Sequence, residues 1–234
     1  MKIENNIIKE YLKNVYFITG TAYAGKSTMV NMLANRFDLV ECGENYHSKF
    51  TDNVVTPKLQ PNLCYFDTIK GWQEFISRTP EEYDRWIIEV SKEAAEFEIV
   101  ELIRISEKQK VIVDTNIPLN ILQEIADYNH VAVMLSPQSM SVELFFERKD
   151  PEKLFIKEQI EMSENPQKTM ENFKKCLAKV NSQEHYDEYA KSGFFTLLRT
   201  NADVDTKEEV LVKLAKHFGF IENDKNVDKV QIIR

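Results

Sequence analysis

The chain has 234 residues, of which 43% are hydrophobic and 29% are charged, so it can bury a sizeable core in one large domain or in a domain with an inserted lobe. A formal net charge of -8 argues against a dedicated nucleic-acid-binding protein, because such proteins usually present a basic surface. Residues 1–10 lack the apolar core of a signal peptide, and no run approaches the roughly 20 apolar residues of a membrane span, so we expect a cytoplasmic protein that does not enter a membrane.

The first strong pattern is a short apolar run followed by a loop with two glycines. Residues 15–19 are largely apolar and include β-branched side chains, which predicts a buried parallel strand. Residues 20–27 then read G-T-A-Y-A-G-K-S, a full match to the phosphate-binding pattern G-x-x-x-x-G-K-[ST]. Residues 26–36 carry apolar side chains at helical spacing. The loop therefore joins a strand to a helix N-terminus, where free backbone N–H groups favour an anion.

Each residue type in this loop has a chemical reason to be there. Glycine lets the backbone wrap closely around a phosphate, because it has no Cβ. Lys26 can reach the β- and γ-phosphates of a nucleotide, and Ser27 can ligate Mg²⁺. We therefore expect ATP and Mg²⁺ as cofactors, bound by Gly20, Thr21, Ala22, Tyr23, Ala24, Gly25, Lys26, Ser27 and Thr28. The alternative is a chance occurrence of the string.

The next segment contains candidates for recognition of a phosphoryl acceptor. Residues 38–42 predict a second strand, and residues 53–68 carry two prolines and are expected to be irregular. Glu44, in the loop after that strand, or Asp67 can act as the base that orients an acceptor hydroxyl. Arg78 can hold the acceptor itself. For all three, ordinary surface charge is the alternative.

Many aromatic residues lie between positions 46 and 86, among them Tyr65 and Trp86. A planar acceptor can stack on such side chains, although they can equally form the apolar core of a lobe. Pro80 then predicts the first turn of a long helix over residues 81–107, with Thr79 as its N-cap.

A second apolar strand, residues 110–114, ends in a carboxylate. Asp114 stands where a magnesium-side carboxylate of a phosphate-loop enzyme would lie, because Mg²⁺ prefers hard oxygen ligands. We therefore expect Ser27 and Asp114 to hold the metal. The alternative is a turn-forming aspartate that caps the residues after it.

The last part of the chain alternates helices with two more strands. Residues 118–128, 141–162, 166–180 and 206–218 are predicted helices, and residues 131–135 and 194–198 are predicted strands. A dense charged cluster occupies residues 147–153, where Arg148, with Lys149 or Lys153, can close over ATP as part of a lid. The alternative for that cluster is a solvated helix face with i,i+4 ion pairs.

Five short strands that alternate with helices predict an α/β protein with a parallel sheet covered on both faces. Ligands of such sheets bind at the carboxyl ends of the strands. Residues 20–27, Glu44, Asp114 and Asn201 all lie at such ends, which predicts one common site.

On these residues the chain resembles the nucleoside and nucleoside-monophosphate kinase group of phosphate-loop kinases. Residues 20–28 carry the specific match, with looser support from Asp114, the Arg148 region and the final strand, loop and helix. The resemblance implies a three-layer P-loop NTPase fold with a five-stranded parallel sheet and a helical lid. It implies one kinase domain over residues 1–221, with an acceptor-binding lobe at 44–104, a lid at 141–180 and a polar tail at 222–234.

The same resemblance implies ATP-dependent phosphoryl transfer to a small acceptor, most naturally a nucleoside or nucleotide. ATP's adenine would then lie near Asn201, and Lys26, Glu44, Asp67, Asp114 and Arg148 would be the catalytic residues. One departure is Thr115 after Asp114, where thymidylate-kinase-like and deoxynucleoside-kinase-like members usually have arginine. The sequence does not name the acceptor or the oligomeric state.

A polynucleotide end kinase is an alternative that the acidic net charge disfavours. Two other functions remain open. A hydrolytic or regulatory NTPase is one, although the guanine-binding string N-K-x-D is absent and no D-x-x-G follows Asp114. Asp114 also lacks the adjacent glutamate of AAA-type motors. A non-catalytic nucleotide-binding module is the other, and the intact Lys26 and Ser27 argue against it.

Overall fold

A computed structural model describes residues 4–147, 151–199 and 205–221. Across these residues, five strands form one parallel sheet in the order β2-β3-β1-β4-β5. The strands are β1 (Val15–Gly20), β2 (Val40–Cys42), β3 (Val111–Asp114), β4 (Val131–Leu135) and β5 (Phe195–Leu198). All five lie within two residues of their predicted bounds, so the prediction of an α/β protein with a parallel sheet is confirmed.

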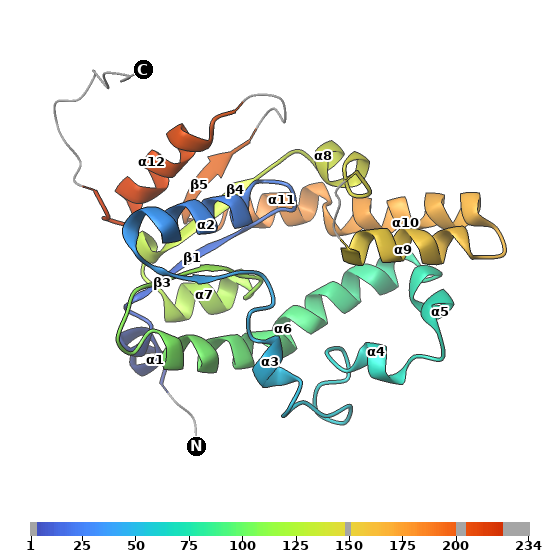
Figure 1. Cartoon of the computed structure of the whole chain (residues 1–234), viewed down its shortest axis with the longest axis horizontal. Coiled ribbons are helices and arrows are strands. Elements are labelled where there is room, and N and C mark those ends of the chain that lie inside the picture. Colours follow the sequence, from blue (N-terminus) through green and yellow to red (C-terminus); the bar gives the residue numbers. More distant parts are fainter. Residues whose placement is uncertain (1–3, 148–150, 200–204, 222–234) are drawn as a thin grey trace.

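Helices connect the strands and surround the sheet (Figure 1). The longer ones are α1 (Asn5–Tyr11), α2 (Lys26–Phe37), α6 (Pro80–Ile105), α7 (Leu119–Ile125), α9 (Pro151–Glu161), α10 (Pro166–Val180), α11 (Gln183–Ala190) and α12 (Lys207–His217). The shorter ones are α3 (Ser48–Thr51), α4 (Tyr65–Thr68), α5 (Trp72–Ile76), α8 (Gln138–Glu143) and the 3₁₀ turn η1 (Tyr128–His130).

The sheet separates two apolar cores because successive residues of a strand point to opposite faces. From β1, Tyr16 and Ile18 pack with α2 and α12, whereas Val15 and Phe17 pack with α6 and α7. Figure 1 shows α2 and α12 on one side of the sheet and α1, α6 and α7 on the other. The arrangement therefore has three layers, with the central strands buried on both faces.

A third apolar core lies away from the sheet, in a region that we call the helical lobe. The lobe consists of α4, α5, α8, α9, α10 and the first half of α6. Its fully buried side chains are Phe75, Ile76, Tyr83, Ile160, Phe173, Cys176 and Leu177. The sequence placed an acceptor lobe and a lid in separate segments, whereas the structure packs α10 of the lid segment directly against α6.

The long helix α6 is confirmed with its predicted N-terminus. Thr79 accepts a hydrogen bond from the backbone of Glu82, whose side chain accepts one from the Thr79 backbone, so a complete capping box forms. Among the described residues, no helix has the length and apolar character needed to cross a membrane.

Some helix predictions are wrong. The single helix predicted over residues 141–162 is replaced by α8 and α9, because Pro151 lacks a backbone N–H and so begins a helix instead of continuing one. The helices α1 and α11 were not predicted. These helices have seven and eight residues, about two turns each, so their periodic signal is weak. Both are stabilised by packing on other elements, α1 on α7 and α11 on β4.

Candidate functional site

Residues 20–27, which we call the glycine loop, leave β1 in a conformation that requires glycine at the first position. Gly20 has φ of +128°, and a Cβ on this residue would lie 2.0 Å from the carbonyl oxygen of Met134. The next backbone N–H, that of Thr21, donates to the same carbonyl oxygen at 3.1 Å. The loop therefore starts pressed against β4, where no side chain fits.

The loop then turns into α2 through two further residues with positive φ. Tyr23 has φ of +66° and Gly25, the N-cap of α2, has φ of +93°. Such left-handed residues orient neighbouring backbone N–H groups toward a common point. The N-terminus of α2 adds its own free N–H groups and the positive end of the helix dipole. The geometry suits a phosphate group.

Ser136, directly after β4, and Ser141, on α8, hold the first half of the loop. The backbone N–H of Ser136 donates to Thr21 Oγ1 at 2.8 Å. The hydroxyls of Ser136 and Ser141 both donate to the carbonyl oxygen of Ala22, at 2.5 and 3.2 Å. These bonds join residues more than 110 positions apart, so the loop shape depends on the tertiary fold.

The middle of the loop contacts the helical lobe and the end of β5. The Tyr23 hydroxyl donates to the carbonyl oxygen of Leu144 at 2.7 Å, and Arg199 Nη1 donates to the carbonyl oxygen of Tyr23 at 3.0 Å. The ammonium of Lys153, on α9, lies 5.8 Å from the centre of the Tyr23 ring. Lys153 is therefore a cation from the charged segment around Arg148 that the structure places beside the loop.

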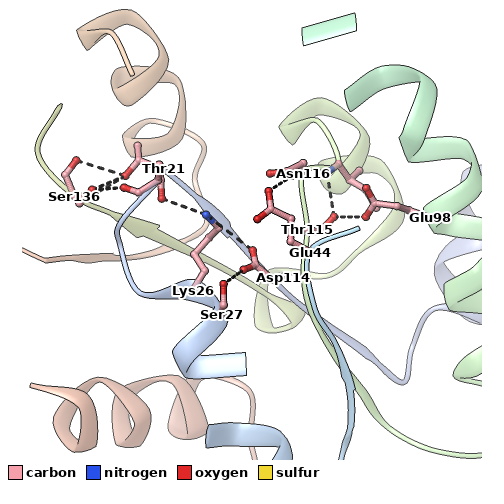
Figure 2. Close-up of polar contacts among 11 residues, drawn as sticks. Thr21, Lys26, Ser27, Glu44, Glu98, Asp114, Thr115, Asn116 and Ser136 are labelled. Carbon is pink, nitrogen blue, oxygen red and sulfur yellow. Dashed lines mark hydrogen bonds and ion pairs between the residues drawn. The ribbon is translucent and has the colours of Figure 1, made fainter. Parts of the chain in front are cut away.

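Lys26, Ser27 and Asp114 meet at the carboxyl edge of the sheet (Figure 2). The Ser27 hydroxyl donates to Asp114 Oδ2 at 2.7 Å. Lys26 Nζ donates to the carbonyl oxygen of Thr21 at 3.2 Å and lies 4.0 Å from Asp114 Oδ1. Asp114 is only 3% exposed and the Lys26 side chain is 14% exposed, so the pair is shielded from solvent.

The donor set at this point fits a magnesium ion. A hydroxyl and a carboxylate that already touch can both turn to one cation, and both are the hard oxygen ligands that Mg²⁺ prefers. Mg²⁺ typically uses one or two carboxylates together with phosphate oxygens and water. Ser27 and Asp114 are therefore the residues of the glycine-loop region that can hold it.

Burial raises the pKa of Asp114 above its usual value, and the nearby Glu44 carboxylate adds to this effect. Lys26 and the hydrogen bond from Ser27 act in the opposite direction. The raised pKa means that the protein groups around Asp114 compensate its negative charge poorly. A bound divalent cation would supply that compensation.

A second group of polar contacts lies immediately beyond Asp114 on the same sheet edge (Figure 2). Asn116 Nδ2 donates to Glu44 Oε1 at 3.1 Å, which fixes the exposed Glu44 near the loop. The Thr115 hydroxyl donates to Glu98 Oε2 at 2.8 Å and accepts from the backbone N–H of Ile117 at 3.0 Å.

Glu98 is a buried carboxyl within this network. It extends from α6, is 3% exposed and has a pKa raised to about 7, chiefly by burial, against which the hydrogen bond from Thr115 acts. The charges of Glu44 and Asp114 raise its pKa further. Three carboxyl groups therefore influence one another at the end of β3.

The structure brings together most of the predicted site residues, but not all. Lys26, Ser27 and Asp114 are in contact, and Glu44 lies in the adjoining network. Asp67 does not join them: it is exposed on α4, in the helical lobe, which Figure 1 shows well away from α2. Asp67 follows a proline-containing segment without a predicted strand, so the sequence did not indicate where in the fold its side chain would lie. The predicted residues Arg148 and Asn201 lie outside the described residues.

Sequence reasoning missed several residues that shape this site, namely Glu98, Asn116, Ser136, Ser141 and Arg199. Ser136 and Arg199 each follow a predicted strand, so the strand-end rule that selected Asp114 could have selected them as well. Glu98 gave no such signal, because a glutamate within a helix is usually exposed.

A cavity of about 210 Å³ adjoins the glycine loop on the β5 side. Its walls include Gly25 and Thr28 from the start of α2, Met134 from β4, and Arg199 and Lys207 from either side of residues 200–204. The cavity is continuous with the N-terminus of α2, and its lining is partly apolar. It can hold a planar group that is attached to a phosphate in the loop.

Comparison of the chain with protein-family models and with curated proteins gave no match.

Proposed function

We propose that this protein is an ATP-dependent small-molecule kinase, with a nucleoside or nucleotide as the most natural acceptor. The observation that carries the proposal is the joint placement of Lys26, Ser27 and Asp114 around the glycine loop at the carboxyl edge of a parallel sheet. Phosphoryl transfer depends mainly on positioning and on stabilising charge, and these are the groups it requires.

In this proposal the triphosphate of ATP lies in the glycine loop and its adenine in the 210 Å³ cavity beside Thr28 and Arg199. Lys26 contacts the β- and γ-phosphates, since its ammonium is already held at the loop by Thr21. Mg²⁺, held by Ser27 and Asp114, neutralises charge on the β- and γ-phosphates when it is bound.

Glu44 is the best candidate for the group that orients the acceptor hydroxyl. Glu44 accepts a hydrogen bond from Asn116, and its negative charge helps to raise the pKa of Asp114. Its side chain is exposed at the sheet edge, where an acceptor can approach. Asp67 is supported only by the sequence. Lys153, from the same charged cluster as Arg148, is the lid cation that the described residues support, because its ammonium lies 5.8 Å from the centre of the Tyr23 ring in the loop.

The test is acceptor-dependent release of ADP from Mg²⁺-ATP, measured on a panel of nucleosides and nucleoside monophosphates. A kinase releases ADP faster when its acceptor is present and forms a phosphorylated product that mass spectrometry detects. Glu44→Gln should lower turnover on that acceptor by about a hundredfold, in the range of general-base loss. The matched variant Asp67→Asn should leave turnover unchanged.

Three results would contradict the proposal or part of it. ADP release that no acceptor accelerates indicates a hydrolytic NTPase. Tight ATP binding without turnover indicates a non-catalytic nucleotide-binding module. Equal turnover in the wild type and Glu44→Gln would remove Glu44 as the base and leave the kinase assignment intact.

A further inference from the structure

The helical lobe contains a second cavity, of about 410 Å³, which we call the arginine cavity. It lies between α4, α5 and the first half of α6, and its walls carry Arg78, Arg85, Tyr65 and Trp86. Cavities that hold small molecules usually measure about 300–1,000 Å³ and combine aromatic walls with a few polar groups. In volume and lining the arginine cavity is of this kind.

Two residues that line this cavity each have a buried polar atom without a hydrogen-bond partner. Among the described residues, four side-chain N or O atoms are in this state, and two of them are Arg78 Nη1 and the Tyr65 hydroxyl oxygen. Burial raises the pKa of Tyr65, and the Arg78 side chain lies close enough for its charge to lower that pKa by a smaller amount. A buried donor without an acceptor costs about 1–3 kcal/mol, and more when it is charged. Such a cost is rarely left uncompensated, and a ligand oxygen that reaches these atoms after a small shift of the two side chains would remove it.

The guanidinium of Arg78 is held in place by aromatic rings and not by a carboxylate. Its Cζ atom lies 3.9 Å from the centre of the Tyr65 ring and 5.2 Å from that of Trp86. The ring contact covers a face of the guanidinium and leaves its N–H edge for hydrogen bonds. The charge is therefore positioned before any partner binds.

The carboxylates that line the cavity have other partners. Glu82 accepts hydrogen bonds from Thr79 in the capping box, Glu89 pairs with Lys92 at 2.7 Å, and Glu74 accepts from the backbone N–H of Lys70. Within the described part of the chain, no carboxylate lies at ion-pair distance from Arg78 or Arg85. Hydrogen bonds from Thr79 lower the pKa of Glu82, and the charges of both arginines lower it further. These three negative charges also make the cavity unsuitable for a ligand with several negative charges.

The arginine cavity is separate from the glycine loop. Trp86 and Glu98 both belong to α6, and the helical rise places them about 18 Å apart. Glu98 accepts a hydrogen bond from Thr115 and therefore lies beside the glycine-loop region. Trp86, nearer the N-terminus of the same helix, lines the arginine cavity. Figure 1 shows the same separation between α2 and the pair α4 and α5. A ligand in the cavity does not touch the phosphates of a nucleotide in the loop.

We propose that the arginine cavity is a second binding site, which takes a small molecule with a single oxyanion, either a carboxylate or a phosphate monoanion. Arg78 and the Tyr65 hydroxyl bind the oxyanion, Arg85 adds positive charge, and Trp86 contacts the body of the ligand. The proposal does not depend on the kinase assignment, because it uses none of the residues of the glycine loop.

The test uses the fluorescence of Trp86. The chain has two tryptophans, so the Trp72→Phe variant leaves Trp86 as the only reporter. This variant is titrated at constant ionic strength with benzoate, with phenyl phosphate and with benzamide, which has the shape of benzoate but no charge. Benzoate or phenyl phosphate should give a saturable change in emission, with a dissociation constant below about 10 mM. Benzamide should bind at least about tenfold more weakly, because it lacks a charge-assisted hydrogen bond.

Variants of the cavity complete the test. Arg78→Gln should weaken anion binding by at least about tenfold, whereas Arg104→Gln, which changes an exposed arginine at the far end of α6, should not. Tyr65→Phe removes one hydroxyl and should weaken binding about threefold. It replaces Arg78→Gln as the decisive variant if circular dichroism shows that Arg78→Gln does not fold.

Each outcome decides the proposal. Saturation by benzoate alone identifies a carboxylate site, saturation by phenyl phosphate alone identifies a phosphate site, and saturation by both shows that the site recognises the charge. The proposal is overturned if neither anion saturates the signal, if benzamide binds as tightly as benzoate, or if the decisive variant binds the anions as the wild-type cavity does.

Discussion

The glycine loop and the arginine cavity differ in how far their polar groups are hydrogen-bonded within the chain. In the loop, Lys26 donates to Thr21, Ser27 donates to Asp114, and distant serines hold the backbone. In the cavity, Arg78 and Tyr65 have buried polar atoms without hydrogen-bond partners. The polar groups of the loop thus already have partners within the chain, whereas the cavity has unused hydrogen-bonding capacity.

This difference shows why one region has a sequence motif and the other has none. Backbone N–H groups bind a phosphate only if consecutive residues adopt special φ values, so the loop requires particular residues at fixed spacing. The cavity is built from side chains of three helices and of the segments before and between these helices, which include Arg78, so its residues need no fixed spacing. The predictions below test whether the loop is as rigid and as charge-dependent as this contrast requires.

The largest effect is expected from Lys26→Ala. The change removes a shielded cation that contacts the phosphates in the proposed complex, and loss of one such group typically lowers turnover by about a hundred- to a thousandfold. Calorimetry with an ATP analogue and steady-state assays measure the effect. Lys108→Ala, at an exposed site, is the control. Equal ATP affinity and turnover in both variants would disprove the role of Lys26.

Gly20→Ala tests the rigidity of the loop. The new Cβ would lie 2.0 Å from the Met134 carbonyl oxygen, and φ of +128° is strained for alanine. We expect a loss of unfolding free energy of about 2–5 kcal/mol, which urea denaturation measures. Gly43→Ala is the control, because a Cβ there meets no atom within 4 Å. A loss as small as in the control would show that the loop can relax.

Glu98→Gln tests the buried carboxyl next to the loop. The folded-state pKa of about 7 lies above the usual 4.5, so the folded state holds a proton that the unfolded chain releases between these values. As the pH rises above 4.5, the burial of a carboxyl that tends to ionise therefore lowers the unfolding free energy of the wild type. Below pH 4.5 this loss is absent, because Glu98 is protonated in both the folded and the unfolded state.

Glutamine avoids this cost and keeps an acceptor for Thr115. We expect Glu98→Gln to be more stable than the wild type by about 2–3 kcal/mol at about pH 8, and the difference to vanish near pH 4.5. Urea titrations at several pH values measure it, with the exposed Glu96→Gln as control. A difference that stays constant with pH would rule out this titration.

The smallest effect is expected from Asp114→Asn. Asparagine keeps the size of the side chain and its hydrogen-bonding oxygen but loses the charge that faces the metal. We expect the Mg²⁺ concentration needed for half-maximal binding of an ATP analogue to rise about ten- to a hundredfold. Asp127→Asn, at a surface ion pair with Lys9, is the control. An unchanged Mg²⁺ dependence would place the metal elsewhere.

Whether a site residue could be predicted from the sequence depends on how far along the chain its partners lie. The site residues Asp114 and Glu44 could be predicted because strand ends of a parallel sheet share one edge. Asp67 lies apart from them on α4 of the helical lobe, since no strand fixes its position, and its role as the base stays a prediction. Glu98 was missed because its role comes from Thr115, which is 17 positions away along the chain but adjacent in space.

The sequence by itself determined the glycine loop, the strands of the sheet and the capped start of α6. These features depend on residues next to one another in the chain, through backbone conformation, side-chain periodicity and capping. Only the tertiary structure decided that α10 packs on α6, that Glu98 is buried beside Asp114, and that Arg78 faces a cavity. Burial and desolvation depend on elements that meet only after folding, so local sequence patterns do not specify them.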